Sequence, residues 1–464
     1  ESMKMEHEIK AVSGGKILHI HVSPGEAIWE GHTLMLLEEG AVEGAIDEEH
    51  DEIDPDYIRP DLEESYHRHA KTLDKNRPDT VRKRHDKGLR TARENILDLC
   101  DNDTFVEYGP LVIAAQRRRH SVEHLMEMSP ADGMVTGIGA VNGELFGDPD
   151  ARCVVMSYDY TVLAGTQGAQ NHRKTDRLID ISSNGQMPMI IFAEGGGGRP
   201  GDTDGLGSGQ RTFSRFATLS GLVPMIGITT GRCFAGNASL LGCCDVIIAT
   251  EGSNIGMGGP AMIEGGGLGI FAPEDIGPTS VQVASGVIDI LVEDEVEAVE
   301  VAKKYLSYFQ GPLPNFEAHD QRRMRHIVPE NRLRVYSIRD VIETIADLAS
   351  VLELRPNFGH GMITSLIRIE GRPVGVIANN PHHLGGAIDS DAADKGARFM
   401  QLCDAFDIPL LYLCDTPGIM VGPEVEHTGL VRHSSRMFIV GANLNVPFFT
   451  IIIRKAYGLG AIAM

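Results

Sequence analysis

Gly133-Met134-Val135-Thr136 recurs 228 residues later as Gly361-Met362-Ile363-Thr364, and this repeat sets the architecture of the chain. After an excess of seven residues in the first copy, the offset becomes 221 and then holds. The pairs matched at that offset include Leu163 with Leu384, Gly165 with Gly386, Lys174 with Lys395, Arg177 with Arg398 and Pro188 with Pro409. Agreement at so regular a spacing predicts two tandem copies of one structural unit.

Each copy alternates strand-like and helix-like segments. In the first copy, residues 154–157 predict a buried strand, 170–184 predict a helix and 189–193 predict a second strand. This alternation is typical of α/β folds, in which helices cover parallel or mixed sheets. Ligands in such folds bind at the carboxyl ends of strands, so the functional site is expected in the turns found there.

Glycine-rich turns occupy those places in both copies. The first copy has Glu194-Gly195-Gly196-Gly197-Gly198-Arg199, and the second has Asp415-Thr416-Pro417-Gly418 and Arg454-Lys455-Ala456-Tyr457-Gly458-Leu459-Gly460. Glycine lets a backbone N–H approach a ligand oxygen, and a helix N-terminus adds partial positive charge. Four glycines are also typical of a flexible connector, but their position directly after an apolar strand favours a binding turn. None of the turns has phosphate-binding GxxxxGK[ST] or dinucleotide-binding GxGxxG spacing.

The first residues place one lysine between two methionines, in Met3-Lys4-Met5. Apolar residues over 17–22 and 34–37, with a Pro24-Gly25 turn between them, predict two strands after this lysine. Most lysines are solvated surface charges. The run nevertheless resembles the biotinyl carrier domain of biotin-dependent carboxylases, whereas lipoyl domains usually flank their lysine with Asp and Ala. The resemblance implies biotin covalently attached to Lys4.

The net charge of −23 is unevenly distributed. Residues 38–64 hold thirteen acidic side chains against one arginine, and we predict a solvated acidic linker over residues 39–80. Residues 68–93 hold ten Lys or Arg, but they lack interleaved aromatic residues and the whole chain is acidic. No nucleic-acid partner is therefore expected. Residues 90–99 predict a helix that opens a new domain.

Cysteine, histidine and apolar patterns exclude several classes. Seven cysteines and eighteen histidines show no metal-ligand spacing, which predicts reduced thiols in a cytoplasmic protein and no metal site. No apolar run approaches the ~20 residues of a membrane span, so no membrane partner is expected. The longest run, near 446–453, is predicted to be a buried strand.

From about Thr91 to Met464 the chain resembles the carboxyltransferase component of acyl-CoA carboxylases. The stretches that carry the resemblance are Arg90-Thr91-Ala92-Arg93-Glu94, Cys403-Asp404-Ala405-Phe406, Asp415-Thr416-Pro417-Gly418 and Arg454-Lys455-Ala456-Tyr457-Gly458. The family has two crotonase-like (ββα superhelix) halves, as the repeat requires, preceded here by part of an all-β biotinyl domain. The expected domains are 1–38 (C-terminal half of the biotinyl carrier), 39–80 (linker), 81–330 (N-half) and 331–464 (C-half, truncated).

The resemblance implies an acyl-CoA carboxylase, a ligase that forms carbon–carbon bonds. Its carboxyltransferase moves CO2 from carboxybiotin to the α-carbon of an acyl-CoA. By resemblance, the N–H groups of Gly196 and Gly197 stabilise the thioester oxygen, and those of Leu459 and Gly460 the biotin oxygen. Close relatives have Gly and Ala at the last two positions. Two alternatives are a biotin-dependent decarboxylase coupled to a membrane sodium pump, and a non-catalytic scaffold, which the intact turns disfavour.

Further expectations concern cofactors and partners. Lys174 and Lys395 are candidates for contacts to CoA phosphates, with a surface or inter-subunit ion pair as the alternative for each. Residues 256–269 are a candidate acyl tunnel. A biotin carboxylase module that uses ATP and Mg is expected before residue 1, and closing helices after Met464. A homo-oligomer, hexameric by resemblance, with active sites between subunits is also implied.

Overall fold

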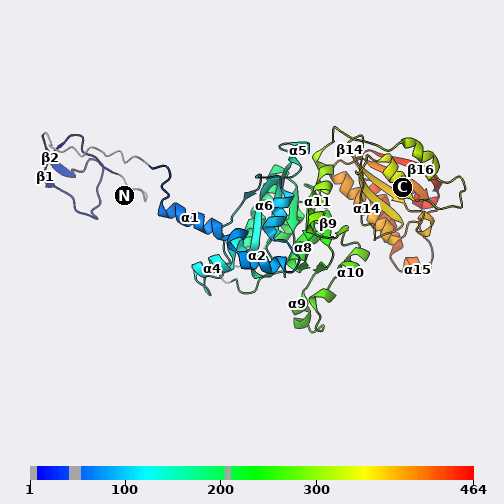
Figure 1. Cartoon of the computed structure of the whole chain (residues 1–464), viewed down its shortest axis with the longest axis horizontal. Helices are drawn as coiled ribbons and strands as arrows, with labels where there is room; N and C mark the ends of the chain where they lie inside the picture. Colours follow the sequence, from blue (N-terminus) through cyan, green and yellow to red (C-terminus); the bar gives the residue numbers. More distant parts are fainter. Residues whose placement is uncertain (1–7, 41–53, 203, 205–210) are drawn as a thin grey trace. The chain divides into compact units, whose positions relative to one another are not determined.

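The computed structural model describes residues 8–40, 54–202, 204 and 211–464. Lys4 lies outside the described residues. The chain divides into two units, Glu1–Glu64 and Ser65–Met464, which are described separately (Figure 1).

The first unit contains an antiparallel pair of strands, β1 (Gly15–Ile20) and β2 (Met35–Glu39). They confirm the two strands predicted in this region. Ile17 faces Leu37 across the pair, yet no side chain within residues 8–40 is buried. A lone two-stranded sheet is marginally stable in water, so the described part of this unit has no core of its own.

The second unit holds two large sheets, as far as the described residues show. The first has the order β11-β9-β7-β6-β5-β4-β3. Its strands are β3 (Val106–Glu107), β4 (Met134–Ala140), β5 (Arg152–Tyr158), β6 (Met189–Phe192), β7 (Met225–Thr229), β9 (Val246–Thr250) and β11 (Ile290–Val292). The second sheet has the order β12-β13-β14-β15-β16. Its strands are β12 (Leu352–Leu354), β13 (Met362–Ile369), β14 (Arg372–Asn379), β15 (Leu410–Thr416) and β16 (Phe448–Ala456). A small parallel pair joins β8 (Arg232–Phe234) and β10 (Asn254–Gly256).

Helices connect and cover these sheets (Figure 1). In the N-terminal part they are α1 (Pro60–Lys71), α2 (Pro78–His85), α3 (Ala92–Leu99), α4 (Val122–Met128), α5 (Gly143–Phe146), α6 (Ala169–Gly185), α7 (Thr212–Ala217), α8 (Gly236–Gly242), α9 (Pro260–Gly265), α10 (Thr279–Ala284) and α11 (Glu295–Gln310). They continue as α12 (Met324–Ile327), α13 (Ile338–Ile345), α14 (Ser390–Ala405), α15 (Pro423–Glu426), α16 (Leu430–Gly441) and α17 (Gly458–Ala463).

The two sheets repeat one topology. An antiparallel pair (β4–β5, then β13–β14) is followed by two parallel neighbours (β6 and β7, then β15 and β16). The long crossover helix between the second and third strands of this pattern is α6 in one half and α14 in the other. The repeat in the sequence is therefore also a repeat in the structure, with α/β alternation as predicted.

Helix α11 joins the two halves. It packs on α3, β7 and β9, and its buried residues share one hydrophobic cluster with β12, β13 and α14. Phe309 of α11 meets Phe406 edge-on, with ring centroids 5.2 Å apart. Asp294 caps its N-terminus by accepting from the N–H groups of Val296 and Glu297. The halves thus share a continuous core.

Two expectations differ from the structure. Residues 60–80, expected as linker, include α1 and the start of α2, and Arg84 of α2 reaches the first sheet by pairing with Glu194. The apolar strand near 446–453 forms as β16, but its first five residues are exposed. The reason is topological. Among the described residues, β16 is an edge strand paired with β15 alone, whereas its counterpart β7 lies between β6 and β9.

Candidate active site

The glycine-rich turn of the first half follows β6. Gly195 has a φ of +151°, and a Cβ there would lie 2.1 Å from Gly165 O, so only glycine fits. Gly195 N–H donates to Arg232 O at 2.7 Å, which ties the turn to β8. The turn therefore lies at the carboxyl end of a parallel strand, where ligands are expected.

Two neighbouring N–H groups of this turn differ in their bonding. Gly197 N–H donates to Asn237 Oδ1 at 3.0 Å, and both residues are buried. No described residue accepts a hydrogen bond from Gly196 N–H. The expectation that Gly197 supplies a free donor is contradicted here, because an internal side chain already occupies its N–H.

A buried ion pair anchors the start of the turn. Arg84 Nη1 and Nη2 donate to the two carboxylate oxygens of Glu194 at 2.9 and 2.6 Å. Both side chains are below 10% exposed. Bidentate pairing fixes the carboxylate in one orientation. Glu194 is therefore bound as a structural partner of its turn, as expected from the sequence.

Asp415 takes the equivalent place at the end of β15, and it is completely buried. Tyr336 Oη donates to its Oδ2 at 2.8 Å, and Arg454 Nε donates to the same oxygen at 3.1 Å. Lys455 donates to Oδ1 through its backbone N–H at 3.2 Å. Burial and the neighbouring Asp415 raise the pKa of Tyr336, so its hydroxyl remains a donor.

The two predicted residues of the second turn begin helix α17. Leu459 is 60% exposed, whereas Gly460 is buried against the Gly418 turn. A Cβ on Gly460 would lie 2.6 Å from the carbonyl carbon of Gly418. No described residue accepts from the N–H groups of Leu459 or Gly460. Position 460 therefore needs glycine, and the N–H groups of Leu459 and Gly460 are two available donors.

Lys174 and Lys395 are not placed to bind CoA phosphates, and that prediction is wrong. Lys174 Nζ donates to the carbonyls of Ala131 and Met134, and burial lowers its pKa to about 8. Lys395 is 1% exposed, donates to Arg355 O at 2.7 Å and also to Phe358 O, and burial lowers its pKa to about 7. Both lysines instead tie the crossover helix to the segment around the first strand of the repeat.

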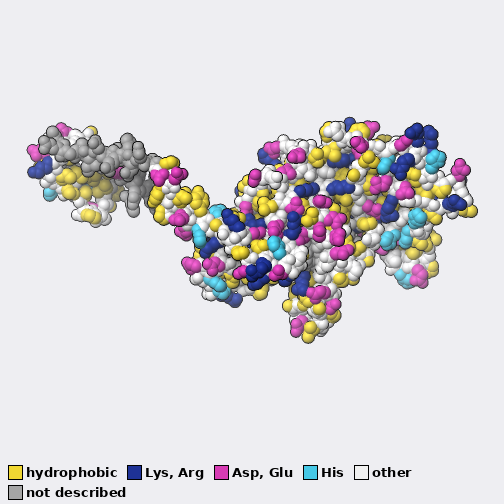
Figure 2. Space-filling model, viewed as in Figure 1, with side chains coloured by type: hydrophobic (Ala, Val, Ile, Leu, Met, Phe, Trp, Pro, Cys, Tyr) yellow, Lys and Arg dark blue, Asp and Glu magenta, His cyan; other side chains and the backbone are white. Residues whose placement is uncertain are grey.

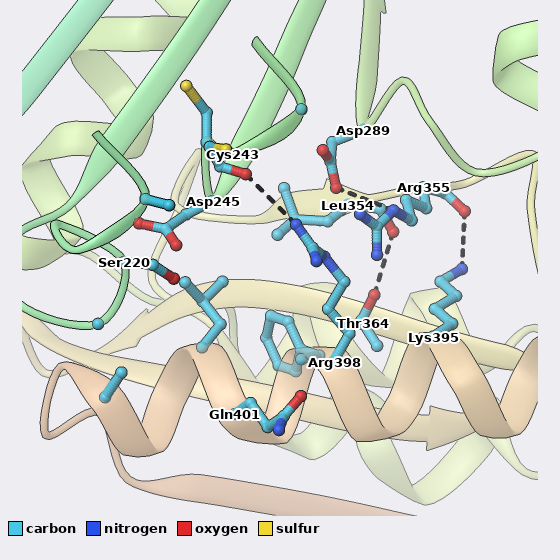
Figure 3. Close-up of a pocket in the computed structure, with 17 residues that line it drawn as sticks. Ser220, Cys243, Asp245, Asp289, Leu354, Arg355, Thr364, Lys395, Arg398 and Gln401 are labelled. Atoms are coloured by element: carbon cyan, nitrogen blue, oxygen red, sulfur yellow. Dashed lines mark hydrogen bonds and ion pairs between the residues drawn. The ribbon is translucent and has the colours of Figure 1, made fainter. Parts of the chain in front are cut away.

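A charged cavity of about 530 Å³ lies between the halves (Figure 3). Asp245 and Arg398 line it, and Arg398 donates to Cys244 O at 3.3 Å. Burial raises the pKa of Asp245 to about 7. Asp245 immediately precedes β9, so the cavity lies at the amino ends of the parallel strands. It is therefore at the opposite end of the sheet from the glycine-rich turns.

The candidate acyl tunnel is exposed. Met257, Met262 and Leu268 are 65–75% exposed around α9, which projects from the lower edge in Figures 1 and 2.

Two residues of the site, Arg84 and Asn237, were not predicted from the sequence. Asn237 follows directly on the glycine-rich stretch 231–236, and an asparagine at a helix start was the only local signal for it.

Comparison with known proteins identifies the family. The carboxyl transferase domain model matches residues 83–464. The chain is 33% identical over 396 residues to the methylmalonyl-CoA carboxyltransferase 12S subunit of Propionibacterium freudenreichii subsp. shermanii, covering 83% of this chain and 73% of that protein. It is also 33% identical over 396 residues to the biotin-dependent long chain acyl-coenzyme A carboxylase beta4 subunit of Mycobacterium tuberculosis, covering 82% and 73%. The chain belongs to the carboxyl transferase domain family.

Solved structures agree with this assignment. A single-chain, multi-domain long-chain acyl-CoA carboxylase is 53% identical with a TM-score of 0.85, and the match covers all of this chain. The chain spans 45% of that larger protein. The transcarboxylase 12S hexamer with methylmalonyl-CoA bound is 30% identical with a TM-score of 0.76, covering 87% of this chain and 79% of that one. The carboxyltransferase resemblance is therefore confirmed over residues 83–464. No helix among the described residues is long and apolar enough to cross a membrane.

Proposed function

We propose that this chain transfers a carboxyl group between biotin and the α-carbon of an acyl-CoA. The observation that carries the proposal is the pair of equivalent turns, one in each half, whose Gly196 and Leu459–Gly460 N–H groups have no acceptor among the described residues. The relatives named for acyl-CoA carboxylation and methylmalonyl-CoA carboxyl transfer support it. The chain's own step is a transferase step within a carboxylase.

The reaction needs two places where negative charge is stabilised. Removal of the α-proton makes an enolate, and Gly196 N–H donates to the thioester oxygen that gains charge. Biotin, when bound in its carboxylated form, supplies the CO2 and the ureido nitrogen that takes the α-proton. The N–H groups of Leu459 and Gly460 at the start of α17 stabilise the ureido oxygen, and one such donor is worth on the order of 10²–10³ in rate.

Neither acidic residue at the turns serves as a base. Glu194 is held by two guanidinium donors, and Asp415 by a guanidinium, a phenol and a backbone N–H. A base must reach the α-proton within hydrogen-bond distance, and both carboxylates are instead bound within the protein. The turns therefore contribute to the reaction through their backbone N–H groups, which stabilise the oxygens that gain negative charge.

The first unit is proposed to be the biotinyl carrier, with biotin on Lys4. The β1–β2 pair and the left-handed turn at Gly25 suit a biotinyl hairpin domain. The full coverage of this chain by a single-chain, multi-domain carboxylase also supports this assignment. We retain domain limits at 1–38 for the carrier, 81–330 for the N-half and 331–464 for the C-half. Of the linker expected over 39–80, we assign α1 and the start of α2 to the carboxyltransferase side.

The remaining partners follow from the same proposal. A biotin carboxylase module that uses ATP and Mg loads the carrier with CO2 derived from bicarbonate. The proposed assembly is a cytoplasmic homohexamer with active sites between subunits, which the hexameric 12S structure supports. Exposed apolar residues of β16 and α17, such as Phe449 and Ile462, suit burial in that assembly.

Two assays test the proposal. The chain alone should move the labelled carboxyl group of malonyl- or methylmalonyl-CoA to free biotin. Together with a biotin carboxylase, ATP, Mg and labelled bicarbonate, the biotinylated chain should carboxylate an acyl-CoA, and Lys4→Arg should abolish that reaction. Lys10→Arg is the matched control and should leave it intact. Absence of transfer to free biotin would refute the transferase function, while full activity of Lys4→Arg would refute the carrier role alone.

A further inference from the structure

Asn237 is a buried side chain that bonds three backbone segments of the first turn. It is the second residue of α8 and is completely inaccessible to solvent. Its Oδ1 accepts from Gly197 N–H at 3.0 Å. Its Nδ2 donates to Gly165 O at 3.2 Å and to Glu194 O at 3.3 Å.

These three partners allow the side-chain amide of Asn237 only one orientation. Turning it over would place the amide nitrogen against Gly197 N–H and the amide oxygen against the carbonyls of Gly165 and Glu194. Three contacts would then be repulsive in a site from which water is excluded, where unsatisfied groups are costly. Asn237 therefore fixes the peptide plane at Gly197 rather than merely filling space.

The consequence is an alternation of N–H groups along the turn. Gly195 N–H donates to Arg232 O, and Gly197 N–H donates to Asn237 Oδ1. No described residue accepts from the N–H groups of Gly196 or Gly198. The internal bonds thus remove two of four consecutive donors and leave the other two.

We propose that Asn237 is a positioning residue of the carboxyl-transfer site, which holds Gly197 N–H inside the protein so that the N–H groups of Gly196 and Gly198 face the thioester oxygen. This inference rests on the thioester position proposed above. The inference names Gly198 in place of Gly197 as the second donor and gives Asn237 a role in the reaction. Asn237 acts only through the backbone and does not touch the substrate.

Kinetics of Asn237→Ala test the role. We expect kcat for carboxyl transfer to biotin to fall about 100-fold with KM for the acyl-CoA changed less than about threefold, since the donors move but the CoA contacts remain. Asn237→Asp should recover activity as the pH falls, because a protonated carboxyl can accept from Gly197 N–H and donate to one carbonyl. Gln310→Ala is the matched control. It removes a buried amide that donates to Val141 O at 2.9 Å and Asp150 O at 3.1 Å, far from either turn in sequence, and should leave kcat unchanged.

A kcat of Asn237→Ala within about threefold of the wild type would overturn the inference, as would a loss confined to KM. A wild-type chain inactive toward free biotin would instead refute the proposed function. Should Asn237→Ala fail to fold, a crystal structure of the wild type with a saturated acyl-CoA decides the matter. We expect the thioester oxygen about 3 Å from the nitrogens of Gly196 and Gly198, with the Gly197–Asn237 bond intact. An oxygen bonded to Gly197 N–H would overturn this inference alone, and an oxygen away from the turn would overturn both.

Discussion

The two halves of the second unit use the same scaffold positions with different partners. Lys174 and Lys395 occupy equivalent places and do the same work, since each donates to two backbone carbonyls near the first strand of its repeat. Glu194 and Asp415 are also equivalent. Within the described part of the chain, however, Glu194 has one cationic partner, while Asp415 has a tyrosine and two basic residues. The two halves therefore share the lysine that fixes the crossover helix, but they differ in the residues that bind the carboxylate at each turn.

The difference in anchoring reflects where the partners come from. Arg84 lies 110 residues before Glu194, in a helix that precedes the whole repeat. Arg454 and Lys455 lie in β16, beside Asp415 in the same sheet. The first turn therefore depends on a helix outside the duplicated unit, whereas the second turn is stabilised within its own half. Each half should respond differently to loss of its guanidinium.

Loss of the buried guanidinium should have the largest effect. Arg84→Met leaves Glu194 as an uncompensated buried charge and should lower the free energy of unfolding by about 3–5 kcal/mol. Arg454→Met should cost only about 2 kcal/mol, because Tyr336 and Lys455 still donate to Asp415. Urea unfolding of both variants measures the loss in free energy of unfolding. Arg82→Met is the control, because it removes only an exposed ion pair with Asp79 and should change that free energy by close to nothing. Equal losses in the two halves would contradict the asymmetry.

The next effect compares the two glycine turns. An added methyl group at Gly460 would meet the Gly418 backbone at 2.6 Å, so Gly460→Ala should destabilise by about 1–3 kcal/mol. Gly196→Ala should cost much less, because its Cβ would meet Thr166 Cγ2 at an ordinary 3.5 Å. Thermal unfolding of the two variants tests the difference. A Gly460→Ala variant as stable as the wild type would show that the second turn is looser than described.

A pH effect should distinguish the two buried lysines. Burial lowers the pKa of Lys395 to about 7 and of Lys174 to about 8, from 10.5 for an ordinary lysine. Above these values the unfolded chain holds a proton that the folded chain has released, so each lysine makes stability rise with pH, by up to about 1.4 kcal/mol per pH unit. Lys395→Met should remove most of this rise between pH 7 and 8.5, and Lys174→Met a smaller part near its upper end.

Urea midpoints at several pH values give these slopes. The window stops at pH 8.5 because the buried cysteines, whose thiol pKa values burial raises from 9.0, would begin to oppose the rise. An unchanged slope in Lys395→Met would contradict the low pKa. A slope that changes equally in both variants would contradict the difference between the halves.

The sequence predicted what depends on local pattern and spacing. The repeat, the strand–helix alternation and the position of the Gly195–Gly198 turn all appear as periodicity or composition within a short window. The burial of the lysines does not appear in a short window, because Lys174 donates to backbone carbonyls about forty residues away in sequence. The Arg84–Glu194 pair and the Asn237 contacts likewise join segments that are distant along the chain. Their partners follow from the fold and not from the local sequence.

The exposure of β16 is the clearest instance and gives the smallest predicted effect. Ile228 of β7 and Ile451 of β16 are equivalent at an offset of 223, but Ile228 is fully buried and Ile451 is 51% exposed. In the dissociated chain, Ile451→Thr should therefore change the free energy of unfolding by less than about 0.5 kcal/mol, whereas Ile228→Thr is a core substitution and should cost more. Urea unfolding at low and high protein concentration measures both. A cost for Ile451→Thr that grows with protein concentration is expected where the proposed assembly buries β16. A cost above about 0.5 kcal/mol at low concentration would contradict the exposure of Ile451 in the single chain.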